Sequence, residues 1–196
     1  MITEKAYLIN WYGPFIAQDV KKTREMIGEW ESENPKEECN LYLIWGKKPN
    51  KKKPSYYCGK TIQGVHERFG NKGHHINDVN RINGIWIGCF CNIKPTESDI
   101  LVAENLYTAL LADKVGRQEM LNKINMDFPT KPVTIISRWI NKDSMKPYHS
   151  RDEEAPINKI DDVCLYNYDS EKHRLSLWGA TKLRKMWDVL DSNYEC

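Results

Sequence analysis

Two short segments, residues 41–45 and 55–58, constrain the fold of this chain more than any other feature of its sequence. Both are rich in apolar and aromatic side chains, a composition typical of buried β-strands. The lysine- and proline-containing segment 46–54 between them is longer than a tight hairpin turn requires. Gly59 ends the second segment, and apolar spacing over 61–69 predicts a short helix directly after it. We therefore expect two paired strands with a projecting loop, followed at once by a helix.

The rest of the chain predicts several more strands and helices. The clearest helix is 100–112, and Thr96 and Asp99 before it have the spacing of a capping box. At the start of the chain, residues 6–11 read as extended and Tyr12-Gly13-Pro14 reads as a turn. Further strands are expected at 84–93, 133–140, 162–168 and 174–178, and further helices at 19–30, 114–124 and 182–190.

These elements predict an α+β fold within the broad α/β class, built on a small three-stranded antiparallel sheet flanked by helices. In the helix over 61–69, we expect Ile62, Val65 and Phe69 to share the buried face. A chain of 196 residues is long enough for one buried core with an appended lobe. The expected parts are an N-terminal helical arm over 1–38, a core domain over 39–130, and a C-terminal extension with a β-hairpin and a helix over 131–196.

Basic side chains concentrate around the two predicted strands. Residues 40–90 carry nine basic and two acidic side chains, whereas the whole chain has a net charge of only +2. A local excess of this size attracts polyanions, although a solvated lysine loop is an equally good interpretation of the lysines at 47–53 alone. The lysines that we expect to bind nucleic acid are Lys47, Lys48, Lys51, Lys52, Lys53, Lys60 and Lys72.

The sequence also indicates the cellular environment. No apolar run approaches the roughly 20 residues that a membrane helix needs. The N-terminus has no continuous apolar segment typical of a secretory signal, so we expect a cytoplasmic protein without membrane contact. The six cysteines form no C-x-x-C pair, which disfavours a zinc ribbon, and reduced thiols are expected in that compartment.

Three side chains near the predicted strands suit the cleavage of a phosphodiester. Tyr42 and Tyr57 lie on the two neighbouring strands, and either is a candidate to accept a proton from the attacking water. A phenol does so only if its pKa is lowered, and we expect Lys60 and Arg68 to lower it. Arg68 also offers a planar fork of donors that matches a phosphate group. This neighbourhood therefore predicts a phosphate site.

Glu104 is the candidate metal ligand. Ile100, Ala103, Tyr107 and Leu111 surround it at helical spacing, which places the carboxylate at the edge of an apolar stripe. A carboxylate there is partly desolvated and needs a partner such as a divalent cation or an arginine. The candidates for a neutral hydrogen-bond donor nearby are Asn122 and Asn125.

In their order and spacing, these residues resemble the motifs of the GIY-YIG nuclease superfamily. Asn40-Leu41-Tyr42 stands where that family has Gly-Ile-Tyr, and Tyr57-Cys58-Gly59 stands where it has Tyr-Ile-Gly. The resemblance covers about residues 39–128, and agreement at several positions is more specific than any single short motif. The family's helix arginine, metal-binding glutamate and terminal Leu-Asn are matched by Arg68, Glu104 and Leu121-Asn122.

The resemblance implies a hydrolase that cuts DNA with one divalent ion, Mg²⁺ or Mn²⁺, held by Glu104. It implies that Arg68 stabilises the phosphate, that Asn122 belongs to the site, and that Tyr42 or Tyr57 activates the attacking water. The expected partner is double-stranded or branched DNA, and the analogy favours a stand-alone restriction, defence or structure-specific nuclease. Double-strand cleavage with one active site per chain favours a homodimer.

A non-enzymatic reading stays open beside this one: a catalytically degenerate member that binds nucleic acid through its basic loop. Taken singly, the tyrosines are commonly core aromatics and the arginine a surface residue, so only their joint occurrence favours a site. His74 and His75 follow Arg68, where many family members carry a polar group, but a solvated histidine pair is the commoner interpretation.

Overall fold

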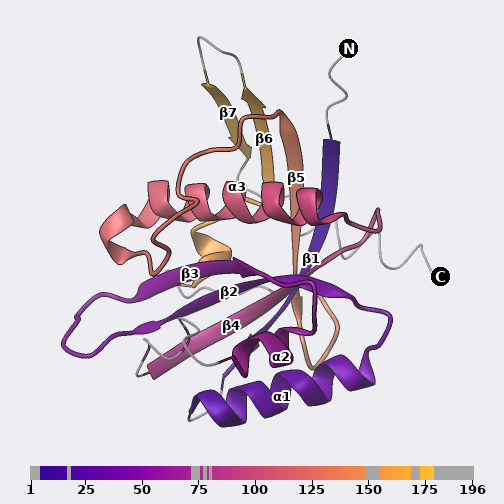
Figure 1. The fold of residues 1–196 in the computed structure, drawn as a ribbon, viewed down its shortest axis with the longest axis vertical. Helices are drawn as coiled ribbons and strands as arrows, with labels where there is room; N and C mark the ends of the chain where they lie inside the picture. The colour runs from indigo at the N-terminus through magenta and orange to yellow at the C-terminus, as the bar shows by residue number, and fades with distance from the viewer. Residues whose placement is uncertain are drawn as a thin grey trace.

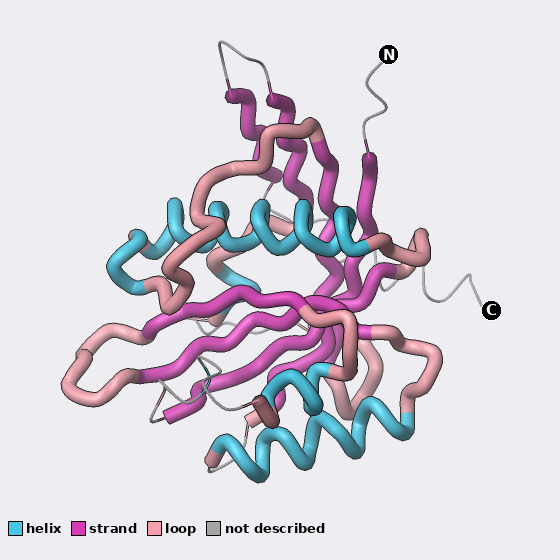
Figure 2. Tube along the Cα trace, viewed as in Figure 1, coloured by secondary structure: helices cyan, strands magenta, loops and turns pink. Residues whose placement is uncertain are grey.

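The computed structural model describes residues 5–16, 19–71, 76, 79, 81–148, 155–168 and 173–178. Its strands form one seven-stranded sheet in the order β3-β2-β4-β1-β5-β6-β7, seen as a continuous curled band in Figure 2. The strands are β1 (Lys5–Phe15), β2 (Cys39–Lys47), β3 (Ser55–Lys60), β4 (Arg81–Phe90), β5 (Val133–Asn141), β6 (Val163–Tyr168) and β7 (His173–Trp178). The helices are α1 (Val20–Glu33), α2 (Val65–Phe69) and α3 (Glu97–Val115), with 3₁₀ turns η2 (Arg117–Glu119) and η3 (Pro156–Asn158).

The prediction of a small three-stranded antiparallel sheet is wrong, although the α+β character is compatible with the structure. β2 does pair with β3 and β4 in antiparallel register, as expected. However, β1 extends the sheet beside β4 and runs parallel to β5 on its other edge. The parallel pairing joins residues 5–13 to residues 133–141, and no local sequence pattern encodes such a distant contact. The sheet therefore passes through all three of the expected parts of the chain.

Local sequence patterns predicted the extent of the first strand, β1, least accurately. Residues 6–11 are extended as expected, but the turn predicted at Tyr12-Gly13-Pro14 is wrong, because β1 continues to Phe15. The change of direction is absorbed within the strand, where the pairing with β4 shifts between Tyr12 and Phe15. The N-terminal segment is thus a central strand followed by α1, rather than a helical arm.

Helices cover the two faces of the sheet at the β3-β2-β4 end. Figure 1 shows α3 on one side of these strands, and α1 with α2 on the other. The alternation of side chains along β2 explains this arrangement. Leu41 and Leu43 are fully buried in the cluster that contains α3, whereas Tyr42 and Ile44 are fully buried in the cluster that contains α1 and α2. β3 therefore has a helix on each side of its outer edge.

The helix predictions succeed where caps and spacing are strong. The capping box at α3 is confirmed, since Thr96 Oγ1 accepts from the Asp99 backbone N–H and the Asp99 carboxylate accepts from the Thr96 backbone N–H. The helix predicted over 114–124 is wrong, because the chain turns at Gly116, whose φ is +91°, a value that favours glycine. After that turn, Met120 forms a bridge with Tyr56. The predicted helix over 182–190 lies outside the described residues.

The described residues test two further expectations, on the C-terminal hairpin and on the cysteines. The predicted C-terminal hairpin is confirmed as β6 and β7, which pair antiparallel. Cys39 and Cys89 form a disulfide between β2 and β4, which corrects the expectation that they are reduced. Cys58, Cys91 and Cys164 are free thiols. Among the helices of the described residues, none combines the length and the apolar character needed to cross a membrane.

Candidate active site

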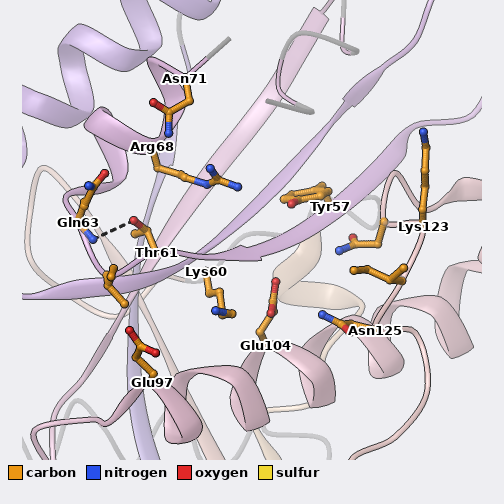
Figure 3. A pocket seen from close by; sticks show the side chains of 13 residues that line it. Tyr57, Lys60, Thr61, Gln63, Arg68, Asn71, Glu97, Glu104, Lys123 and Asn125 are labelled. Carbon is orange, nitrogen blue, oxygen red and sulfur yellow. Dashed lines mark hydrogen bonds between the residues drawn. The ribbon is translucent and has the colours of Figure 1, made fainter. Parts of the chain in front are cut away.

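A pocket of about 700 Å³ lies at β3, the edge strand of the sheet, and residues of both α2 and α3 line it. Its walls come from separate parts of the chain (Figure 3). β3 contributes Tyr57 and Lys60, α2 contributes Arg68, and α3 contributes Glu104. The pocket therefore brings together, from three elements, side chains that the sequence singles out separately.

Glu104 is buried in this pocket, as its helical spacing predicts, with 7% of its surface exposed. Its Oε2 atom has no hydrogen-bond partner among the described residues. Burial raises the pKa of the Glu104 carboxyl, while the charges of Lys60 and Arg68 and a hydrogen bond with the Asn125 side chain oppose that rise; the pKa stays raised overall. The pocket thus contains a desolvated carboxyl with an unused oxygen.

An unused, buried carboxylate oxygen fits a divalent metal ion. Mg²⁺ takes oxygen ligands, keeps several of its waters, and is commonly held by only one or two carboxylates. Within the described part of the chain, no group of three or more His, Cys, Asp and Glu side chains is placed to hold a metal. Glu104 would accordingly be the one protein ligand of the ion. Glu97 is the second carboxylate that lines the pocket.

The two tyrosines occupy different positions. Tyr57 lines the pocket, whereas Tyr42 has none of its surface exposed and lies behind Tyr57, with the ring centroids 5.9 Å apart. The expectation of lowered pKa values is wrong, because burial raises the pKa of both phenols more than Arg68 lowers it. The geometry makes Tyr57 the tyrosine that can meet a ligand.

Gly59 has a steric reason to be glycine. It lies opposite Tyr42 in the pairing of β2 with β3. A Cβ atom at Gly59 would lie 2.4 Å from Cζ and 2.5 Å from Oη of the Tyr42 ring, closer than any real contact permits. The glycine thus leaves room beside β3 for the Tyr42 ring, which stacks on Tyr57.

The helix that carries Arg68 is held in place by α1. Glu31 accepts a hydrogen bond from the Val65 backbone N–H at 2.7 Å, and it contacts Nδ1 of His66 at 2.5 Å. Arg24 donates from Nε to the His66 carbonyl at 2.9 Å. The five-residue α2 is too short to be stable alone, so these contacts fix the direction of Arg68. The sequence did not predict the contacts of Arg24 and Glu31 with α2, because two strands separate α1 from α2 in the sequence.

Asn122 lies in the pocket wall, but its amide is occupied by the backbone of β3. Its Oδ1 accepts from the Cys58 N–H at 3.0 Å, and its Nδ2 donates to the Cys58 carbonyl at 2.7 Å. The preceding Leu121 N–H donates to the Tyr56 carbonyl at 2.7 Å. Asn122 therefore ties the loop to the strand, while Asn125 is the asparagine whose side chain meets Glu104.

The predicted nucleic-acid-binding lysines divide into two groups. Lys60 lines the pocket, whereas the lysines at 47–53 are not among its lining residues. Lys51 donates to the Gln118 carbonyl at 3.1 Å, which places the lysine loop against η2. Lys47 is the last residue of β2, and Lys48, Lys52 and Lys53 belong to the segment that projects beyond β2 and β3 in Figure 1. Lys72, His74 and His75 lie outside the described residues.

Several lining residues escaped sequence reasoning. Glu97 stands seven residues before Glu104, a spacing of two helical turns that was available as a signal. Gln63 and Thr61 line the turn before α2, where the Gln63 backbone N–H donates to Thr61 Oγ1 at 3.0 Å. The others are Ile62, Asn71, Lys123 and Ile124, which carry no sequence signal of their own.

Comparisons with protein families, with curated proteins and with solved structures give no match to this chain. The GIY-YIG resemblance consequently stays a prediction from the residues.

Proposed function

We propose that this chain is a metal-dependent endonuclease that hydrolyses DNA phosphodiester bonds. One observation carries the proposal: a single pocket gathers Tyr57, Lys60, Arg68 and Glu104, and the buried Glu104 Oε2 atom in it has no hydrogen-bond partner in the part of the chain that the structure describes. A carboxylate ligand, a planar cation for phosphate and a phenol for a water are the parts that phosphodiester hydrolysis requires. The resemblance to GIY-YIG nucleases points the same way.

Each pocket residue has a role that follows from its chemistry. Arg68 binds two phosphate oxygens through its planar guanidinium, and Lys60 adds a second positive charge. Tyr57 orients the attacking water through its hydroxyl and takes its proton. Glu104 would hold a divalent ion, which when bound supplies positive charge that stabilises the phosphate and the departing 3′ oxygen.

The raised pKa of Tyr57 limits the fraction of its hydroxyl that can accept a proton. A phenol with a raised pKa is almost entirely protonated at neutral pH, so it accepts a proton only from its small ionised fraction. Arg68 is one described residue whose charge lowers the Tyr57 pKa. Arg68 therefore serves both the phosphate and the base, and its loss affects two steps together.

Nicking of supercoiled plasmid DNA with Mg²⁺ or Mn²⁺ tests the proposal. We expect Glu104→Ala and Arg68→Ala each to reduce the nicking rate by about 10²-fold or more, because each removes charge stabilisation from the transition state. Asp113→Ala, an exposed acidic residue on the same helix, and Arg117→Ala, which removes an exposed ion pair with Asp127, are the matched controls and should nick normally.

DNA binding is measured in parallel by fluorescence anisotropy. If the wild-type protein binds DNA but nicks no substrate with either metal, the endonuclease is excluded and the catalytically degenerate nucleic-acid-binding module is the better description. If Glu104→Ala nicks as fast as the wild type, the pocket is not the catalytic centre.

A further inference from the structure

The exposure of two isoleucines at the pocket is not explained by the packing of the core. Ile62 is 67% exposed and Ile124 is 73% exposed, the highest values among the large apolar side chains of the described residues, and both line the pocket. The helix over 61–69 was expected to bury Ile62, but α2 begins only at Val65, so that Val65 and Phe69 fill the core contact instead. Neither isoleucine is needed to cover the core.

The two side chains stand on different walls. Ile62 belongs to the turn between β3 and α2, and Ile124 belongs to the loop that follows η2. Figure 3 shows their sequence neighbours Thr61 and Lys123 on opposite sides of Glu104. The pocket that holds Lys60, Arg68 and Glu104 is therefore also lined by two exposed aliphatic side chains, which come from two different segments of the chain.

This arrangement selects the chemistry of the ligand. A purely ionic ligand, such as inorganic phosphate, would use Lys60, Arg68 and Lys123 but would leave both isoleucines in water. A phosphodiester has a nucleoside on each side of its phosphate, and each nucleoside offers an apolar sugar edge and a flat base. A pocket that combines charged groups with two exposed aliphatic side chains matches that ligand.

We propose that Ile62 and Ile124 are apolar contacts for the two nucleosides that flank the scissile phosphate, and that they select DNA whose bases are unstacked at that point. This inference rests on the proposed endonuclease function. In a regular duplex the base faces are covered by stacking, so that an aliphatic side chain reaches them only where stacking is broken. Mismatched, branched or single-stranded positions present those faces without the cost of unstacking a paired step.

The test compares a short fully paired duplex with the same duplex carrying a central run of mismatched pairs. The variants are Ile62→Ala, Ile124→Ala and the double variant, with Leu101→Ala and Ile93→Ala as controls, because these two exposed apolar residues do not line the pocket. We expect the wild type and the controls to prefer the mismatched duplex by about tenfold in kcat/KM, and the double variant to lose most of that preference.

A second measurement separates this inference from the function on which it rests. In the Glu104→Gln background, binding of both duplexes is followed with a fluorescent 2-aminopurine at the centre, which reports unstacking without cleavage. Loss of the binding preference in the triple variant supports the contacts even if no nuclease activity is found. An unchanged preference, in cleavage or in binding, overturns the inference while leaving the nuclease intact. The inference is also overturned if the double variant loses a self-association that the wild type shows in sedimentation while its DNA preference is unchanged. The isoleucines would then belong to a protein contact.

Discussion

The side chain of Asn122 pairs with the backbone of Cys58 through both ends of its amide, at 3.0 and 2.7 Å. The Asn122 side chain thereby hydrogen-bonds to the outer edge of β3 in the way that the backbone of a neighbouring strand would. The pairing holds the pocket loop to the strand at the residue directly after Tyr57. The side chain of Asn122, a candidate hydrogen-bond donor of the site, thus binds the backbone of β3.

Asn122→Ala should destabilise the protein because it leaves the buried N–H and C=O of Cys58 without their side-chain partners. We expect a loss of about 1–3 kcal/mol in the free energy of unfolding, measured by urea titration. Asn122→Asp keeps the acceptor but turns an oxygen toward the Cys58 carbonyl, and should cost at least as much. Lys123→Ala, at an exposed residue of the same loop, is the control with a smaller loss. Equal stability of Asn122→Ala and the wild type would contradict this role.

Glu104→Gln should make the protein more stable and less active. The folded-state pKa of Glu104 is raised, so the folded state binds its proton more tightly than the unfolded state does. The fold is therefore favoured below the unfolded pKa of about 4.3 and loses stability as pH rises above that value. The neutral glutamine removes this loss, which predicts a higher Tm than the wild type at pH 7 and no difference near pH 4, measured by circular dichroism.

The same pair of proteins tests metal binding without reference to activity. Mn²⁺ should raise the Tm of the wild type, because a ligand that binds only the folded state stabilises it, and should leave Glu104→Gln unchanged. An equal rise in both proteins would place the metal elsewhere.

The nicking rate of the wild type should increase with pH between about 7 and 10. The active form of a proton acceptor is the ionised one, and the pKa of Tyr57 is raised above its ordinary value near 10, so the active fraction grows about tenfold per pH unit over that range. Tyr57→Phe should lower the rate by about 10²-fold and flatten the profile. Tyr12→Phe is the control, because Tyr12 is also buried with a raised pKa but does not line the pocket. A profile in Tyr57→Phe that still climbs would exclude Tyr57 as the base.

Gly59→Ala should cost about 1–3 kcal/mol of stability, because its Cβ would overlap the Tyr42 ring. The cost should largely disappear in a Tyr42→Ala background, where the ring that it meets is gone. A double-mutant cycle by urea unfolding measures this coupling. Additive losses in the double variant would show that the two residues act independently.

Local patterns predicted the elements around the pocket better than the sheet that contains them. The helical spacing of Glu104 correctly indicated a buried carboxyl, and the capping box placed the start of α3. Tyr57, Arg68 and Glu104 line one pocket, and each lies on an element that local spacing predicted.

The failures came from long-range contacts. Pairing of β1 with β4 and β5 decides that residues 5–15 form a central strand, and neither partner is near in sequence. The raised tyrosine pKa values also escaped prediction, since the charge of Arg68 is visible in the sequence but the depth of burial that outweighs it is not. Glu31 and Arg24, which hold α2, are visible only once α1 is placed beside it.

The position of β1 has a consequence for how the chain reaches its native state. β1 is synthesised before every other strand, yet its neighbours in the sheet are β4 and β5, at residues 81–90 and 133–141. In a nascent chain, one edge of β1 stays unpaired until β4 has emerged, and the other edge stays unpaired until residue 141 at the end of β5 has emerged. Such non-local pairing slows folding and exposes strand edges to aggregation while it waits. A fragment that ends before β5 would leave one edge of β1 open for the same reason.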